Sequence, residues 1–123
     1  MSKEVVAGIM GNMMAEAGGN TLYIQPWANN GSYYGICQWS RGYYQVWNKD
    51  LKGQLAFLKK TIKYEIDTYG NNYKYGFKYE DFLKLKTPEE AATAFFKCYE
   101  RGSASISVRT NNARMAYNYY TNK

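Results

Sequence analysis

Glu16 is the acidic residue whose position best suits chemistry. It comes near the end of an apolar helical segment that begins at Glu4, and the sequence Ala17-Gly18-Gly19-Asn20 then breaks the helix. Further along, Tyr34-Gly35-Ile36-Cys37-Gln38-Trp39 is an aromatic and amide cluster without charge. A carboxyl group facing such surroundings is desolvated, which raises its pKa and suits it to donate a proton. Proton donation of this kind is what cleavage of a glycosidic bond requires.

The other acidic residues fit structural roles. Glu4 and Asp50 have the positions of helix-start residues, and Glu100 stands beside Arg101 in an apolar helix, which predicts a structural ion pair between them. The remaining acids fall on helix surfaces, caps or lysine-rich stretches, where a solvated charge is the default: Glu65, Asp67, Glu80, Asp81, Glu89 and Glu90.

The chain contains no histidine and only two cysteines. Ser-His-Asp and Cys-His hydrolysis need an imidazole base, and common zinc sites need His or more Cys than this. We therefore expect no metal and no cofactor, and a mechanism that uses carboxyl groups. Cys37 and Cys98 lie in apolar stretches, which favours buried, reduced thiols over a disulfide.

Charge and aromatic content indicate the kind of partner. The net charge is +6 and aromatics make up 18% of the 123 residues, with fourteen Tyr and three Trp. Flat amphipathic rings suit sugar faces, and a diffuse positive charge favours weak attraction to an anionic wall polymer. An ordinary solvated surface with an excess of basic residues would also account for the positive net charge. We expect no nucleic-acid partner, since no known nucleic-acid motif is present, and no membrane span, since no apolar run approaches roughly 20 residues.

Helical periodicity and capping signals predict a mainly α domain over residues 1–123. Its expected elements are a helix over 3–17, an aromatic-rich loop over 18–49 with a small hairpin around Gly31-Ser32, a helix from Asp50 to Gly70, a short turn over 80–83, a helix from Thr87 to Gly102, and a last helix through 109–120. Gly8 and Gly11 lie one turn apart on the first helix, so we expect close packing there.

Several segments together resemble the phage tail lysozyme family. They are Ala7-Gly8-Ile9-Met10-Gly11-Asn12 followed by Glu16, Tyr34-Gly35-Ile36-Cys37-Gln38-Trp39-Ser40, Gln54-Leu55-Ala56-Phe57-Leu58, and Thr87-Pro88-Glu89-Glu90-Ala91-Ala92 with Tyr99-Glu100-Arg101. The resemblance covers nearly the whole chain in order. It implies a lysozyme-like fold related to goose-type lysozymes and lytic transglycosylases.

The resemblance also implies an activity and a site. Such domains cleave the β-1,4 bond between N-acetylmuramic acid and N-acetylglucosamine in peptidoglycan. By position, Glu16 is the general acid and Gln38 and Trp39 line the floor of the glycan groove. Tyr99 is expected close to Glu16. With Tyr34 and Ser32, these residues make up the expected substrate-binding set.

Two features leave the chemistry open. Ala17 follows Glu16 where the family commonly has Ser, and no Asp or Glu lies between Glu16 and Tyr34 to act as a second carboxylate. Ser32, Asn30 or Gln38 could position water for hydrolysis. Alternatively, the 6-hydroxyl of the substrate attacks, as in a lytic transglycosylase. Asp50 is a distant candidate for the second carboxylate, and a non-catalytic glycan-binding module is the remaining alternative.

The sequence start, Met-Ser-Lys-Glu-Val-Val, lacks the long apolar core of a signal peptide. We therefore expect a phage tail, a holin or a similar route to bring the protein to the bacterial cell wall. The expected setting is a monomeric domain of a larger phage endolysin or tail-associated lysin.

Overall fold

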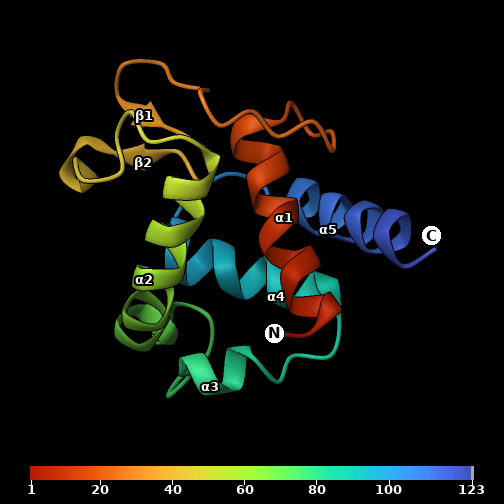
Figure 1. Cartoon of the computed structure of the whole chain (residues 1–123). Helices are drawn as coiled ribbons and strands as arrows, with labels where there is room; N and C mark the ends of the chain where they lie inside the picture. Colours follow the sequence, from red (N-terminus) through yellow and green to blue (C-terminus); the bar gives the residue numbers. More distant parts are fainter. Residues whose placement is uncertain (123) are drawn as a thin grey trace.

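A computed structural model describes residues 1–122, and its first helix α1 (Lys3–Ala17) runs through the middle of the molecule (Figure 1). The helix begins at Ser2, whose side chain accepts a hydrogen bond from the Val5 amide, and ends at Gly18, whose N–H binds the Met14 carbonyl. The bounds confirm the sequence prediction. Glu16 consequently lies in the last turn of α1.

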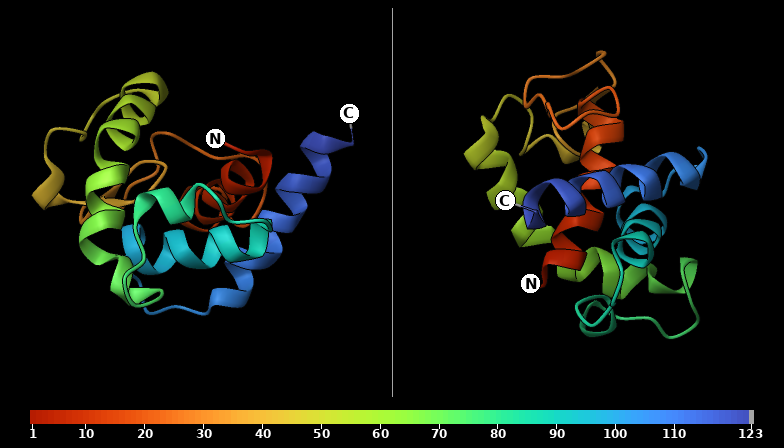
Figure 2. Two further views of the ribbon diagram at one scale, coloured as in Figure 1. Left: turned by 90° about the horizontal axis from the view of Figure 1, so that it is seen from below. Right: turned by 90° about the vertical axis from the view of Figure 1, so that its right-hand side faces the viewer.

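Two helices from the end of the chain pack on α1. They are α4 (Pro88–Phe95) and α5 (Ile106–Thr121), seen from two further directions in Figure 2. A Cβ built on Gly8 would lie 2.4 Å from the Ala91 Cβ, and one on Gly11 would lie 2.6 Å from the Arg109 carbonyl oxygen. The expected close packing at both glycines is therefore confirmed. Because α5 passes so near Gly11, its residues come beside the end of α1.

Helix α2 (Leu51–Tyr69) forms the opposite side of the molecule (Figure 1). Asp50 caps it by accepting a hydrogen bond from the Gly53 amide, as predicted. A short 3-10 turn η2 (Gly70–Asn72) follows, then a single helical turn α3 (Tyr79–Phe82). Buried Gln54 ties α2 to the loop before it, since its Oε1 accepts from the Ile36 amide at 2.8 Å.

The aromatic-rich loop forms a small two-stranded sheet. Strand β1 (Tyr33–Tyr34) pairs antiparallel with β2 (Trp39–Ser40), in the register Tyr33 with Ser40 and Tyr34 with Trp39, and a 3-10 turn η1 (Arg41–Tyr43) follows. The hairpin turn thus lies over residues 35–38. Gly31-Ser32, where the hairpin was expected, is enclosed instead by a single bridge between Asn29 and Tyr34.

The helix that Thr87 begins changes its winding before it ends. The Thr87 hydroxyl accepts from the Glu90 amide at 3.1 Å, which confirms the predicted cap. After Phe95 the chain forms a π-helical turn η3 (Phe96–Glu100), and Arg101 is left-handed with φ of 53°. The helix was expected to continue to Gly102, and it ends earlier because the left-handed Arg101 terminates it.

Apolar side chains from α1, α2, α3, α4, η3 and the loop form the main core. Cys37 and Cys98 are both buried and unbonded, which confirms the expectation for the two thiols. No helix within residues 1–122 is long and apolar enough to span a membrane.

Candidate active site

Glu16 forms an ion pair with Arg109 of α5. The distance from Arg109 Nη1 to Glu16 Oε2 is 3.1 Å, and the Glu16 side chain keeps 22% of its surface exposed. The same Nη1 donates to Asn12 Oδ1 at 3.0 Å, and the guanidinium lies 4.3 Å from the centre of the Phe96 ring. Arg109 itself is buried, so its charge acts on Glu16 with little screening by solvent.

Asn12 holds this arrangement to the helices behind it. Its Nδ2 donates to the Gly8 carbonyl and to the Ala92 carbonyl of α4 at 3.0 Å, which leaves Oδ1 to accept from Arg109. The side chain is fully buried and every bond it makes is internal. It therefore fixes where Arg109, and hence Glu16, can lie.

Burial raises the pKa of Glu16 above its ordinary value, and this effect exceeds the opposing attraction of Arg109. Desolvation disfavours the carboxylate, whereas the ion pair and its hydrogen bond favour it. A partly exposed carboxyl group with a raised pKa has the property that a proton donor needs.

The hairpin turn that precedes Trp39 depends on a strained backbone conformation at Gln38. Gln38 has φ of 51°, a left-handed conformation that is costly for a residue other than glycine. Its Nε2 donates to the carbonyls of Ala28 and Gly35 at 2.9 and 2.8 Å, which holds the turn in place. The hydrogen bonds of Gln38 thus stabilise the turn that presents Trp39.

Tyr99 of η3 holds the Trp39 side chain in place by a hydrogen bond. The indole Nε1 donates to the Tyr99 hydroxyl at 2.9 Å, and that hydroxyl lies 2.7 Å from Thr61 Oγ1 of α2. Both Trp39 and Tyr99 are buried, and burial raises the pKa of the Tyr99 phenol. The phenol therefore stays neutral and serves as a hydrogen-bonding link among the hairpin, α2 and η3.

A small cleft of about 110 Å³ opens between the hairpin and η3. Its lining includes Gln38, Trp39, Ser40, Tyr99 and Glu100. Cys37 lines it too, and burial raises the pKa of both Cys37 and Glu100, with a smaller contribution from the charge of Glu16. Glu16 itself is not among the residues that line the cleft, and its charge acts on the cleft wall from nearby.

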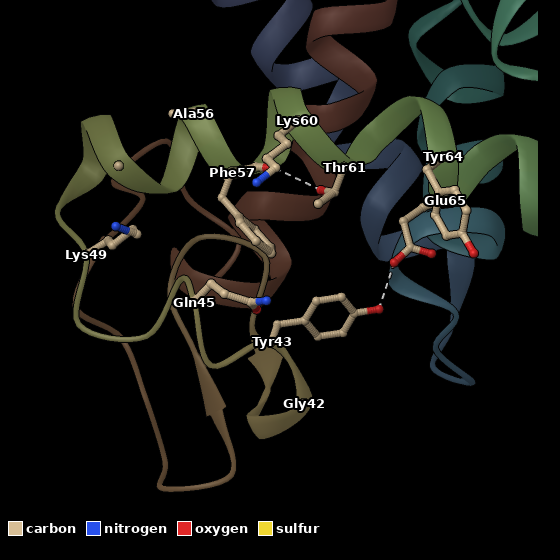
Figure 3. Close-up of a pocket in the computed structure, with 11 residues that line it drawn as sticks. Gly42, Tyr43, Gln45, Lys49, Ala56, Phe57, Lys60, Thr61, Tyr64 and Glu65 are labelled. Carbon is tan, nitrogen blue, oxygen red and sulfur yellow. Dashed lines mark hydrogen bonds between the residues drawn. The ribbon is translucent and has the colours of Figure 1, made fainter.

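A larger groove of about 800 Å³ runs between η1 and α2 (Figure 3). Figure 3 shows the Tyr43 ring directed toward Glu65, whose Oε1 accepts from the Tyr43 hydroxyl at 2.7 Å. Lys49 and Lys60 contribute positive charge, and Phe57 an aromatic surface. Tyr43 lines both the cleft and this groove, so the two hollows adjoin.

The expected substrate-binding residues occupy different environments. Gln38, Trp39 and Tyr99 line the cleft. Tyr34 is buried, its hydroxyl donates to the Lys49 carbonyl and its ring stacks on Trp47, so the side chain supports the hairpin from within. Ser32 is exposed on the loop before β1. No hydrogen bond joins Tyr99 to Glu16 in the described part of the chain.

The expected ion pair between Glu100 and Arg101 is wrong. Arg101 Nη1 instead binds Glu65 Oε2 at 3.1 Å, and Arg101 Nη2 donates to the Tyr43 hydroxyl at 3.0 Å. Since Arg101 is left-handed, its side chain departs from the helix in a different direction from that of Glu100. Adjacent residues in sequence do not share a helix face, which is a general reason against such pairs.

Arg109, which pairs with Glu16, and Glu100, which lines the cleft, are candidate site residues that the sequence did not indicate. Arg109 shares a helical stripe with Ala113 and Ala116, and all three are buried. An arginine on an otherwise small and apolar stripe is a signal for a buried cation that must have an acidic partner. Glu100 carried no comparable signal, because its place depends on the π-helical turn.

No group of three or more His, Cys, Asp or Glu side chains within residues 1–122 is arranged to hold a metal ion.

A mainly α domain with a small hairpin beside the end of its first helix is consistent with a lysozyme-like fold. The family model for phage tail lysozymes matches residues 1–120, and the chain therefore belongs to the phage tail lysozyme family. No curated protein and no solved structure gives a significant match. Membership makes the chain a lysozyme-like domain whose substrate is peptidoglycan.

Proposed function

We propose that this protein is a muramidase that cleaves the β-1,4 bond between N-acetylmuramic acid and N-acetylglucosamine, with Glu16 as the general acid. The observation that carries the proposal is the Glu16 carboxyl group, which is partly exposed at the end of α1 and has a pKa raised by burial. Family membership supplies the peptidoglycan substrate.

Arg109 has a different effect at each stage of the reaction. In the free protein it opposes the effect of burial on the pKa of Glu16. A glycan strand seated over Glu16 displaces water, which raises the pKa further and favours the protonated acid. Protonated Glu16 then gives its proton to the glycosidic oxygen as the bond to C1 breaks. Arg109, 3.1 Å away, stabilises the carboxylate that this step creates.

We propose that the glycan lies along the hairpin, with the cleft beside Gln38 and Trp39 accepting a polar group of one sugar. The cleft, at about 110 Å³, is too small for a whole sugar ring. The adjoining groove is large enough to accept a neighbouring part of the substrate, and Lys49 and Lys60 suit the carboxylates that peptidoglycan carries. Tyr34 acts indirectly, through the shape of the loop, whereas the exposed Ser32 contacts the glycan directly.

Glu16→Gln tests the assignment. The variant is expected to fold normally and to lose about 100-fold or more of its activity on purified sacculi, the usual range for a missing general acid. Glu89→Gln is the matched control, because Glu89 also pairs with an arginine of α5 but lies away from the cleft. Full activity of Glu16→Gln would overturn the assignment of Glu16.

The products separate the remaining alternatives. Mass spectrometry of digested sacculi should show reducing N-acetylmuramic acid ends, the result of hydrolysis. Anhydro ends would show that the 6-hydroxyl of the substrate attacks, as in a lytic transglycosylase. Binding to sacculi without any released product would identify a non-catalytic glycan-binding module.

We further propose that residues 1–123 form one domain of a tail-associated lysin or endolysin, brought to the wall by a phage tail or a holin route. The helices pack around a shared core, which is the property of one folding unit. A single cooperative unfolding transition, the same by fluorescence and by circular dichroism, is the expected result.

A further inference from the structure

We propose that Glu100 is the second carboxyl group of the catalytic site and that it accepts the proton of the attacking water. The inference rests on the proposed function, since it assigns the partner that Glu16 needs for hydrolysis. The residue stands at the end of the π-helical turn η3 and lines the cleft beside Gln38 and Trp39.

One oxygen of the Glu100 carboxyl group is buried without a hydrogen-bond partner, although the residue as a whole is only partly buried. Within residues 1–122, Oε2 of Glu100 is the buried side-chain oxygen or nitrogen that has no hydrogen bond. Leaving such a group unsatisfied is costly, so an oxygen of this kind usually has a ligand or a water in the working protein. The cleft of about 110 Å³ is large enough for a water molecule and has polar walls.

The neighbouring cations do not neutralise Glu100 by direct contact. Arg101 binds Glu65 and the Tyr43 hydroxyl, and Arg109 binds Glu16 and Asn12. Glu100 forms no ion pair in the described part of the chain. Its carboxyl group is therefore available to a molecule bound in the cleft.

Glu100 and Glu16 are coupled through their charges. Burial raises the pKa of Glu100 well above its ordinary value, the charge of Glu16 raises it further, and Arg109 and Arg101 oppose both effects. The ionisable groups that face Glu100 are thus Glu16 of α1, Arg109 of α5 and Arg101, with the Cys37 thiol and the Tyr99 phenol on the same cleft wall. Because the pKa of Glu100 is raised well above its ordinary value and that of Glu16 is raised less, a proton shared by the two carboxyl groups lies mainly on Glu100 in the free protein.

One shared proton is what a hydrolytic cycle requires. The reactive form is the other arrangement, with the proton on Glu16 and Glu100 a carboxylate, and a glycan seated over Glu16 favours it by raising the pKa of Glu16 further. Water attacks C1 of the muramic acid and gives a proton to Glu100, while the bond from C1 to the glycosidic oxygen breaks and that oxygen takes the proton of Glu16. The cycle leaves Glu16 ionised beside Arg109 and Glu100 protonated, and transfer of a proton through solvent from Glu100 to Glu16 restores the reactive form.

Glu100→Gln tests the proposal with the shape of the side chain retained. The amide cannot accept the proton, so kcat on purified sacculi is expected to fall about 100-fold or more with little change in KM. Glu89→Gln, away from the cleft, should keep full activity. If Glu100→Gln folds and keeps a third or more of the activity, the proposal is overturned.

Rescue by sodium azide separates a base from a structural residue. Glu100→Ala should regain about 10-fold in activity with azide, because the azide anion attacks C1 without needing a base, and the product should be a glycosyl azide. Glu16→Ala should gain nothing, since it lacks the acid. Loss of activity in Glu100→Ala without azide rescue would overturn the proposal.

If the variants do not fold, the pH dependence of the activity of the unaltered protein tests the role of Glu100. A general acid alone predicts that activity falls only on the alkaline side, whereas the pair predicts a fall on both sides. Loss on the alkaline side alone would overturn the role of Glu100 and leave Glu16 as the acid. Full activity of Glu16→Gln would instead overturn the proposed function, so the two failures are distinct.

Discussion

Replacing Arg109 by methionine removes the cation that joins Glu16 to Asn12. The guanidinium donates to Glu16 Oε2 at 3.1 Å and to Asn12 Oδ1 at 3.0 Å, and the residue is buried. Removal of a buried charge leaves its partners unsatisfied, which typically costs several kcal/mol. Since Glu16 is partly exposed and can take up a proton, we expect a loss of about 3 kcal/mol in the free energy of unfolding at pH 7.

The pH dependence of that loss is part of the prediction. Glu16 has a raised pKa in the folded protein, so the stability linked to it is present at low pH and is lost as the pH rises through the folded pKa. Without Arg109 the pKa rises further. The loss of stability should therefore be larger at pH 7 than at pH 4, where Glu16 can be protonated at little cost.

Urea denaturation followed by tryptophan fluorescence at the two pH values measures both quantities. Arg114→Met is the matched control, because Arg114 is also on α5 and forms a more exposed ion pair with Glu89. Its loss should be several-fold smaller, since exposed ion pairs contribute little. Equal losses for the two arginines, or a larger loss for Arg109→Met at pH 4, would contradict a stabilising contact between Arg109 and Glu16.

Two further predictions concern the elements that position Glu16. Gly11→Ala should destabilise the protein by about 2 kcal/mol in urea denaturation, because the new Cβ would lie 2.6 Å from the Arg109 carbonyl oxygen. Gly42→Ala, whose nearest neighbour would be a side-chain atom at 3.6 Å, should cost much less, and equal costs would contradict this packing. Thr87→Ala should lower the free energy of unfolding by about 1 kcal/mol through loss of the helix cap, and an unchanged midpoint would show that the cap contributes nothing.

The sequence was sufficient to predict most helix boundaries. Ser2, Asp50 and Thr87 each cap a helix by binding an amide three residues further along the chain. Such contacts are local, so they follow from residue types at short spacing. The close packing at Gly8 and Gly11 was also predictable, because glycine in a helix interior is costly without a neighbour that needs the space.

The hairpin register and the end of the fourth helix were not predictable in the same way. The strands contain two residues each, too few for a periodic pattern, and their turn depends on the left-handed backbone at Gln38. The helix ends in a π-helical turn at Glu100, which a regular helical period does not describe. The predicted ion pair between Glu100 and Arg101 was wrong for the same reason, because it assumed a regular helix at these two residues.

Residue types and their spacing were enough to predict the mainly α class, to show the family resemblance and to indicate Glu16 as the candidate acid. The partners of Glu16, in contrast, depend on how the helices pack. Arg109 is 93 residues away along the chain, and it reaches Glu16 because Gly11 lets α5 approach α1 closely. Glu100 joins the same neighbourhood through the packing of η3 against α2. Local signals specify a residue's element, whereas the charge and solvent around a carboxyl group depend on which distant segments the core brings beside it.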